Sequence, residues 1–173
     1  DLVALTRRFY HALGLDIDDV LARSDLYERE GKQQHAYCIH VDRRGDVRTL
    51  CNVRPNHYWM ATLLHEFGHA VYDKYLDAEL PYLLRQPAHI LMTEAVAIMM
   101  GRLASDTDWI DTYCPPDGQT AAAMAEPMRR YCAAESLIMA RWVPVMCHFE
   151  RALYRDPGQD LNRLWWDLEE HFQ

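Results

Sequence analysis

The sequence predicts a mainly α-helical fold of the α+β type, with one small antiparallel β-hairpin. Apolar residues recur at helical spacing along most of the 173 residues, and only one pair of short β-prone runs flanks a turn that contains glycine. No repeat, low-complexity tract or linker divides the chain, so we expect residues 1–173 to form a single domain. The chain starts at Asp1 and stops directly after a helical pattern, and we therefore expect it to be a fragment of a longer protein.

The first fifty residues predict two helices followed by the hairpin. Residues 2–13 have helical spacing and end at Gly14, and Asp16 is expected to cap a short helix that ends near residue 23. Two β-prone runs then flank the sequence Asp-Arg-Arg-Gly, and they predict strands at 36–41 and 46–52.

The middle of the chain predicts two helices joined by a proline-bounded turn. Residues 56–76 form a long amphipathic pattern with Asn56 as its N-cap. Pro81 and Pro87 bracket a short helical turn. Residues 88–104 are so apolar that we expect this helix to be buried on most of its sides.

The last third predicts a loop and two further helices. The Cys-Pro-Pro-Asp-Gly stretch at 114–118 is the clearest loop signal in the sequence. A long helix is expected over 119–155, where Pro127 and Pro144 should kink or split it. An amphipathic helix over 160–172 ends the chain.

Composition excludes several classes of protein. Half of the residues are hydrophobic and a quarter are charged, which is typical of a globular protein and excludes a disordered chain. No stretch approaches the ~18 apolar residues that span a membrane. A net charge of −8 repels phosphate backbones, so we expect neither a nucleic-acid nor a membrane partner.

The cysteines predict a reducing compartment. There are five of them, scattered and without a Cys-x-x-Cys pair, which argues against a disulfide framework and against a cysteine-based zinc site. We therefore expect reduced thiols in a cytoplasmic protein.

Residues 65–69 carry the chemistry, because they match the H-E-x-x-H pattern. Helix positions four apart lie on one face, so His65 and His69 can bind one metal ion, and imidazole nitrogens suit Zn²⁺. Glu66 lies beside that face, where it can take a proton from a metal-activated water. A catalytic zinc of this kind needs a third protein ligand.

Glu94 is the predicted third ligand. A metzincin would need Gly at 72 and His at 75, but both positions hold tyrosine. Asp73 stands two helical turns, about 12 Å, from His65, which is too far to share one ion. Glu94 lies in a strongly apolar helix, where an unpartnered carboxylate would cost several kcal/mol and a metal would remove that cost. His65, His69 and Glu94 are thus expected to bind one Zn²⁺ per chain and to support amide hydrolysis.

Three alternatives stay open. The five-residue match can be fortuitous, and Glu94 can be a buried, hydrogen-bonded acid without a metal. Glu66 and His69 also form the E-x-x-H pattern of di-iron helix bundles, but none of the nine other glutamates has a histidine three residues on. A catalytically silent helical scaffold that serves in binding is the main functional alternative.

The sequence His-Glu-Phe-Gly-His-Ala at 65–70, with Glu94 twenty-five residues after His69, resembles the gluzincin oligopeptidases. The most similar patterns are those of the thimet oligopeptidase/oligopeptidase F family and the angiotensin-converting-enzyme-like family. This resemblance implies a zincin-like catalytic domain whose deep channel admits short peptides, with the hairpin beside the zinc offering a strand edge to the substrate. On the same resemblance, His35, Tyr37 and His40 are candidates to line that channel.

The sequence departs from this family pattern at two places. Many gluzincins carry an acid four residues after the glutamate ligand, but that residue is Ile98 here, so Asp73 or a backbone carbonyl is expected to orient a zinc histidine. The family also stabilises the oxyanion with a Tyr or His from a segment well beyond the zinc ligands, and no residue before Gln173 matches it well, so this residue is expected outside the fragment; His148 and Tyr154 are weak candidates. We therefore expect a fragment that binds zinc and hydrolyses peptides weakly, and whose uncovered apolar helices lead to self-association.

Overall fold

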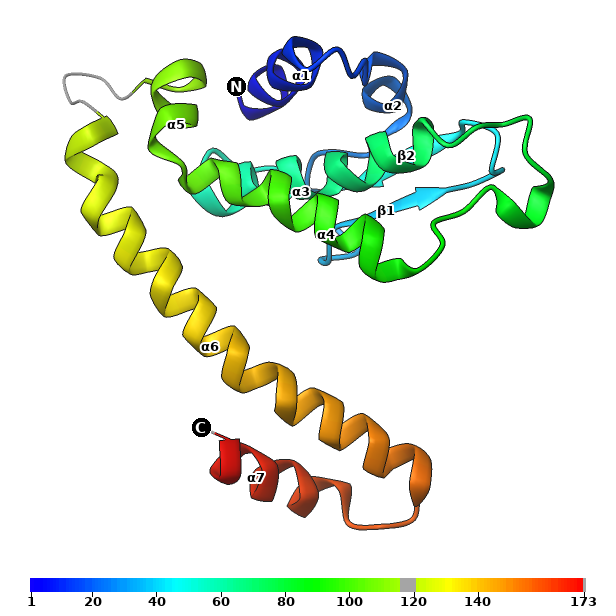
Figure 1. Ribbon diagram of the computed structural model, residues 1–173, viewed down its shortest axis with the longest axis vertical. Helices are drawn as coiled ribbons and strands as arrows, with labels where there is room; N and C mark the ends of the chain where they lie inside the picture. Colours follow the sequence, from blue (N-terminus) through cyan, green and yellow to red (C-terminus); the bar gives the residue numbers. More distant parts are fainter. Residues whose placement is uncertain (116–120, 173) are drawn as a thin grey trace. The chain divides into compact units, whose positions relative to one another are not determined.

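The computed structural model describes residues 1–115 and 121–172, and it confirms a mainly α-helical fold with one antiparallel two-stranded sheet (Figure 1). The chain divides into two compact units, Asp1–Ala123 and Met124–Gln173. Each unit is described by itself below. No helix of the described residues is long and apolar enough to cross a membrane.

The first unit begins with the two predicted helices. Helix α1 (Leu2–Ala12) starts after Asp1, whose carboxylate accepts the backbone N–H of Val3 at 3.0 Å. Helix α2 (Asp18–Arg23) follows. The carboxylate of Asp16 accepts the N–H of Asp18 at 3.0 Å, as a capping side chain would. The N-cap position itself is held by Ile17, so the predicted capping residue lies one residue before that position.

The predicted hairpin is confirmed. Strand β1 (Tyr37–His40) pairs antiparallel with β2 (Val47–Leu50), and residues 41–46 connect them. The turn needs left-handed backbone at Gly45 (φ 105°), which glycine adopts without strain. The edge of β2 that faces away from β1 forms a parallel bridge between Leu50 and Asp25. The edge of β1 is therefore the free edge of the described sheet.

Helix α3 (His57–Lys74) is the central element of this unit. It begins as predicted, because the side chain of Asn56 accepts the N–H of Trp59 at 2.9 Å. The hydroxyl of Tyr10 donates to the carbonyl of Leu64 at 2.5 Å and ties α1 to α3. The helix buries a full apolar face against α1 and the hairpin, and this face consists of Trp59, Met60, Leu63, Leu64, Phe67, Ala70 and Val71.

Two glycines let helix α4 (Ile90–Arg102) lie unusually close to α3. A Cβ added at Gly68 of α3 would stand only 2.9 Å from the Cα of Ala97 on α4. A Cβ added at Gly101 of α4 would stand 3.2 Å from the carbonyl oxygen of Ala61 on α3. Any larger residue at these positions therefore meets backbone.

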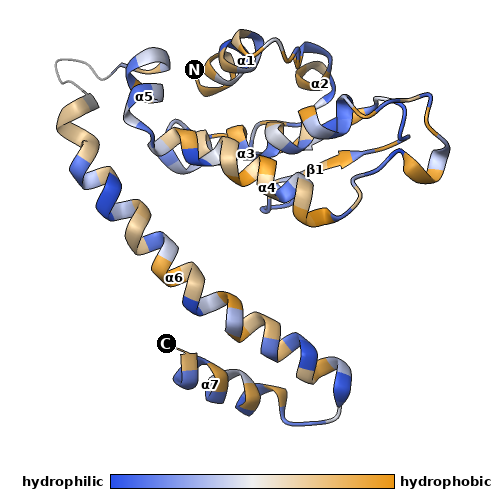
Figure 2. Ribbon diagram, viewed as in Figure 1, coloured by the Kyte–Doolittle hydropathy of each residue, from blue (hydrophilic) through white to orange (hydrophobic). Residues whose placement is uncertain are grey.

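The prediction that helix 88–104 is buried on most sides is wrong. Thr93, Ala97 and Met100 are its buried residues, whereas Ile90 and Leu91 are 73% and 66% exposed. Figure 2 shows that hydrophobic residues follow the helix on its outer side as well. An apolar sequence favours burial, but the number of buried sides depends on how many elements pack against the helix, and α3 covers only one stripe.

A turn and a short helix complete the first unit. The predicted turn between Pro81 and Pro87 is the 3-10 helix η1 (Tyr82–Leu84). After α4, the 3-10 helix η2 (Leu103–Ser105) leads into helix α5 (Thr107–Tyr113), which the sequence analysis missed. The predicted loop at 114–118 is non-helical over its first two residues, and its remainder lies outside the described residues.

The second unit contains most of α6 (Ala121–Arg155) and all of α7 (Leu161–Phe172). The prolines were expected to kink or split this helix; Pro127 and Pro144 lie inside α6 without splitting it. Helix α7 folds back on α6, and the rings of Phe149 and Trp165 meet edge to face with centroids 5.4 Å apart.

Candidate metal centre

Three side chains of the first unit converge across the contact between α3 and α4. His65 and His69 come from α3 and Glu94 from α4. The Nε2 atoms of the two histidines lie 3.5 and 3.3 Å from the two carboxylate oxygens of Glu94. One ligand atom from each residue lies within 4.8 Å of the others. The residues predicted to form a metal site are thus brought together from positions up to 29 residues apart (94 − 65).

The arrangement fits a tetrahedral zinc ion. Zinc binds imidazole nitrogen and carboxylate oxygen at about 2.0–2.2 Å, so two tetrahedral ligands stand roughly 3.3–3.5 Å apart. The distances from the two imidazole nitrogens to Glu94, 3.5 and 3.3 Å, each to a different carboxylate oxygen, have this length. Two imidazoles and one carboxylate also match the ligand set of catalytic zinc sites that leave a fourth position open.

Glu94 lies where the sequence predicts, but not for the reason given. Its side chain is 43% exposed, so the carboxylate is not confined to an apolar core. The α4 face that carries Glu94 is only partly covered by α3. The cost of burying a carboxylate therefore does not identify Glu94 as the third ligand. Its convergence with the two histidines does.

His65 sits in a partly buried setting that favours its neutral form. Burial lowers the pKa of His65, and the neighbouring His69 lowers it further, while the charge of Glu94 acts in the opposite direction. The two rings are nearly perpendicular, with centroids 4.9 Å apart. A neutral imidazole has the free lone pair that a metal ion requires.

The sequence analysis missed one polar residue of this site. Thr93, the residue before Glu94, is buried, and its Oγ1 lies 2.8 Å from Nδ1 of His69. Within the described part of the chain, no hydrogen bond joins Asp73 to His69. The group that lies beside Nδ1 of His69 is therefore Thr93 and not Asp73. The sequence did offer one signal for Thr93, because its hydroxyl lies in a run of mostly apolar residues next to Glu94.

Glu66 is buried and holds its proton unusually tightly. Burial, aided by the charge of Glu94, raises the pKa of Glu66 to about 7. The charge of Glu66 also raises the pKa values of the thiols of Cys38 and Cys51, so the carboxyl lies on the hairpin side of α3.

The other candidates from the sequence are more scattered. Tyr37 and His35 are exposed, whereas Nε2 of His40 accepts the N–H of Gly45 at 3.0 Å and closes the hairpin turn. His148 and Tyr154 belong to the second unit, where the ring of His148 packs on Phe172.

A second cluster with metal-binding side chains consists of His11, Asp16 and Asp18, all exposed. Its carboxylates already have cationic partners, because Asp18 pairs with Arg7 and Asp16 with Lys74. Nothing further distinguishes this cluster from an ordinary surface network.

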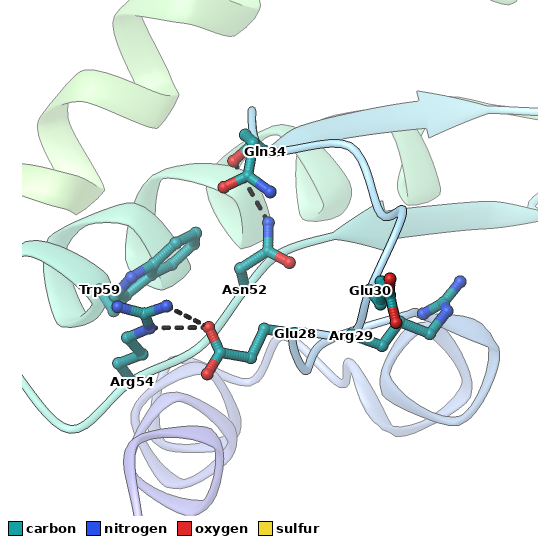
Figure 3. Close-up of a pocket in the computed structure, with 7 residues that line it drawn as sticks. All are labelled: Glu28, Arg29, Glu30, Gln34, Asn52, Arg54 and Trp59. Atoms are coloured by element: carbon teal, nitrogen blue, oxygen red, sulfur yellow. Dashed lines mark hydrogen bonds and ion pairs between the residues drawn. The ribbon is translucent and has the colours of Figure 1, made fainter.

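A polar pocket of about 530 Å³ opens beside the start of α3 (Figure 3). A hydrogen-bonded ion pair between Arg54 and Glu28 crosses it, and Asn52 donates to the backbone of Gln34 at its edge. None of the four residues of the predicted site lines it. The pocket is therefore separate from the ligand cluster.

Comparison with known proteins points to one family. The sequence profile of peptidase family M3 matches residues 21–173, which include every residue of the ligand cluster. No curated protein matches the sequence.

Proposed function

This chain belongs to peptidase family M3, a family of metallopeptidases, and we propose that it hydrolyses peptide bonds in short peptides with one zinc ion. In this proposal His65, His69 and Glu94 are the zinc ligands and Glu66 is the general base. The observation that carries it is the convergence of the three ligand atoms within 4.8 Å across two helices.

The proposed roles follow from the chemistry of the side chains. Zinc bound by these ligands supplies a Lewis acid that polarises the scissile carbonyl and makes a water more acidic. The Glu66 carboxylate takes a proton from the attacking water and delivers it to the leaving amine nitrogen. A positioned carboxylate beside the metal can make both transfers in turn, first as a base and then as an acid.

The hairpin is the proposed place for the substrate backbone. Strand β1 is the outer edge of the described sheet, and its free edge presents N–H and C=O groups to an extended peptide. Glu66 lies on the hairpin side of α3, since its charge acts on Cys38 of β1. A peptide added to β1 would therefore run close to the general base.

Metal content tests the ligand assignment. We expect about one zinc per chain in protein purified without added metal, and loss of zinc in His65→Ala and in Glu94→Ala. Zinc retained in Glu94→Ala would show that another residue is the third ligand. A parent chain that binds no zinc even when it is supplied would favour the silent scaffold.

Substitution of Glu66 tests the catalytic assignment. Glu66→Gln removes the base but leaves the shape of the side chain, so we expect peptide hydrolysis to fall by about 10²–10⁴-fold with zinc content unchanged. Glu79→Gln makes the same change at an exposed residue outside the site and should not alter the rate. Equal rates for Glu66→Gln and the parent would exclude Glu66 as the base.

A further inference from the structure

The contact between His69 and Thr93 joins the two helices of the site by a hydrogen bond. Oγ1 of Thr93 lies 2.8 Å from Nδ1 of His69, which is an ordinary hydrogen-bond length. Thr93 is only 8% exposed, so water competes little for this contact. The next residue, Glu94, extends its carboxylate to Nε2 of the same imidazole, 3.3 Å away. One histidine ring is thus held at both nitrogens by neighbouring residues of α4.

The direction of this hydrogen bond decides which nitrogen can bind a metal. A neutral imidazole carries one proton, and a hydroxyl oxygen can accept a hydrogen bond. If Nδ1 carries the proton and donates it to Thr93, the lone pair lies on Nε2. Nε2 is the nitrogen that faces Glu94. The opposite tautomer would place the proton on Nε2 and block the metal ligand.

From this geometry we propose that Thr93 is the positioning residue for His69, holding the ring in the Nδ1–H tautomer with Nε2 free for zinc. This inference rests on the proposed function, because it gives Thr93 a role toward the same metal. Thr93 acts through His69 and touches neither the metal nor the substrate. Helix α4 therefore supplies both a ligand and the group that orients another ligand, in adjacent residues.

The neighbours of His69 leave this role to Thr93. Ile98, one turn after Glu94, is apolar and cannot accept a hydrogen bond. The charge of Asp73 and that of His69 influence each other, but within the described residues the two side chains are not hydrogen-bonded. A hydroxyl also orients the imidazole without adding a negative charge. With one carboxylate ligand and a neutral acceptor, the site with Zn²⁺ keeps a net charge of about +1.

Zinc affinity tests the role of the hydroxyl. Thr93→Val keeps the shape and removes the acceptor, and we expect it to weaken zinc binding by about 10–100-fold in a competition titration with a chelator. Thr93→Ser keeps the hydroxyl and should bind zinc within about 3-fold of the parent. Thr112→Val is the matched control, because it removes an exposed helical hydroxyl of α5 that bonds to the carbonyl of Asp108. Parent-like affinity in Thr93→Val, or equal weakening in Thr93→Ser, would overturn the proposal.

The tautomer of His69 separates this inference from the proposed function. Without a metal, the Glu94 carboxylate 3.3 Å from Nε2 would itself favour a proton on that nitrogen, so the tautomer is measured in metal-free Glu94→Ala protein. Imidazole nitrogen NMR at about pH 8, well above the usual pKa of a histidine, should show Nδ1–H for His69 in this background with Thr93 or with Thr93→Ser. Thr93→Val should shift the ring toward Nε2–H. An Nε2–H ring in Glu94→Ala overturns the role of Thr93 even if the parent binds zinc. An Nδ1–H ring there, together with a parent that binds no zinc, contradicts the proposed function while supporting the orientation by Thr93.

Discussion

At the scale of single residues, the thiols differ in reactivity because they differ in burial. Burial raises the pKa of Cys38 and of Cys51 to about 12, and nearby carboxyls add to the effect. Cys114 and Cys147 are exposed. The thiolate is the nucleophile, and a thiol with a pKa of about 12 is ionised to roughly one part in 10⁴ at pH 8.

These thiols give a direct test of the hairpin packing. We expect iodoacetamide at about pH 8 to alkylate Cys114 and Cys147 first, and Cys38 and Cys51 only after unfolding. Peptide mass spectrometry at timed intervals measures the order, and labelling in concentrated urea provides the reference rates. If Cys38 were labelled as quickly as Cys147 in folded protein, the strand pair would not cover it as described.

Residue spacing predicted the ligand cluster but not its surroundings. The H-E-x-x-H spacing is local to one helix, so His65 and His69 could be brought together without knowledge of tertiary structure, and the family match confirms the resemblance drawn from this motif. Glu94 was chosen for its apolar neighbours, although its side chain is 43% exposed. Thr93 escaped notice because its partner becomes visible only when the rotation of α4 against α3 is known.

At the scale of elements, the glycine inside the H-E-x-x-H motif controls how α3 and α4 meet. Gly68 lies between the two histidines in sequence, on the side of α3 that faces Ala97. A methyl group there would approach the α4 backbone to 2.9 Å, a distance that real Cβ contacts almost never show. Backbone cannot rotate away as a flexible side chain can, so the helices would have to separate.

Gly68→Ala is therefore expected to destabilise the chain although alanine is the better helix former. Overpacking costs about 1–3 kcal/mol, against a gain of about 1 kcal/mol in helix propensity, which leaves a net loss of up to about 2 kcal/mol. Urea unfolding followed by circular dichroism measures the change in the free energy of unfolding. Gly158→Ala is the control, because a Cβ there meets its nearest atom at an ordinary 3.5 Å. A gain in stability in Gly68→Ala would mean that the helix pair has more room than the structure gives it.

The order of elements was largely predictable, whereas their environments were not. Helix periodicity and the cap at Asn56 are local signals, and they located α1 and α3 to within two residues. The short helix α5 was missed although Asp106 caps it by accepting the N–H of Trp109. Proline was expected to kink or split α6, but a helix can continue without a break past a residue that lacks one donor. Burial of α4 depends on partners that no local pattern specifies.

At the scale of the whole molecule, the proposed zinc ion would join elements that are distant in sequence. Two ligands lie on α3 and one on α4, so a bound ion would hold the two helices together. An unfolded chain does not preform this site, and zinc binding is then coupled to folding. Stability should follow the concentration of free zinc.

Removal of the metal is thus expected to lower the midpoint of thermal unfolding. At a free zinc concentration of about 1,000 times the Kd, the stabilisation amounts to about 4 kcal/mol. Calorimetry with zinc and with a chelator measures the difference. His65→Ala should lose the shift and Glu66→Gln should keep it, because only the first residue is a proposed ligand. An equal midpoint in both conditions would contradict the proposed bridge between helices.

The close contact at Gly68 also bears on which ions the chain can select. The close approach of α3 and α4 sets how near the backbone of Glu94 stands to the histidines, and the present side-chain distances suit ions with bonds of about 2.0–2.2 Å. A larger ion bound by the same three side chains would require Glu94 to change its rotamer or the helices to spread. The preference of the site for a small ion would then depend in part on a residue that has no side chain and never touches the ion.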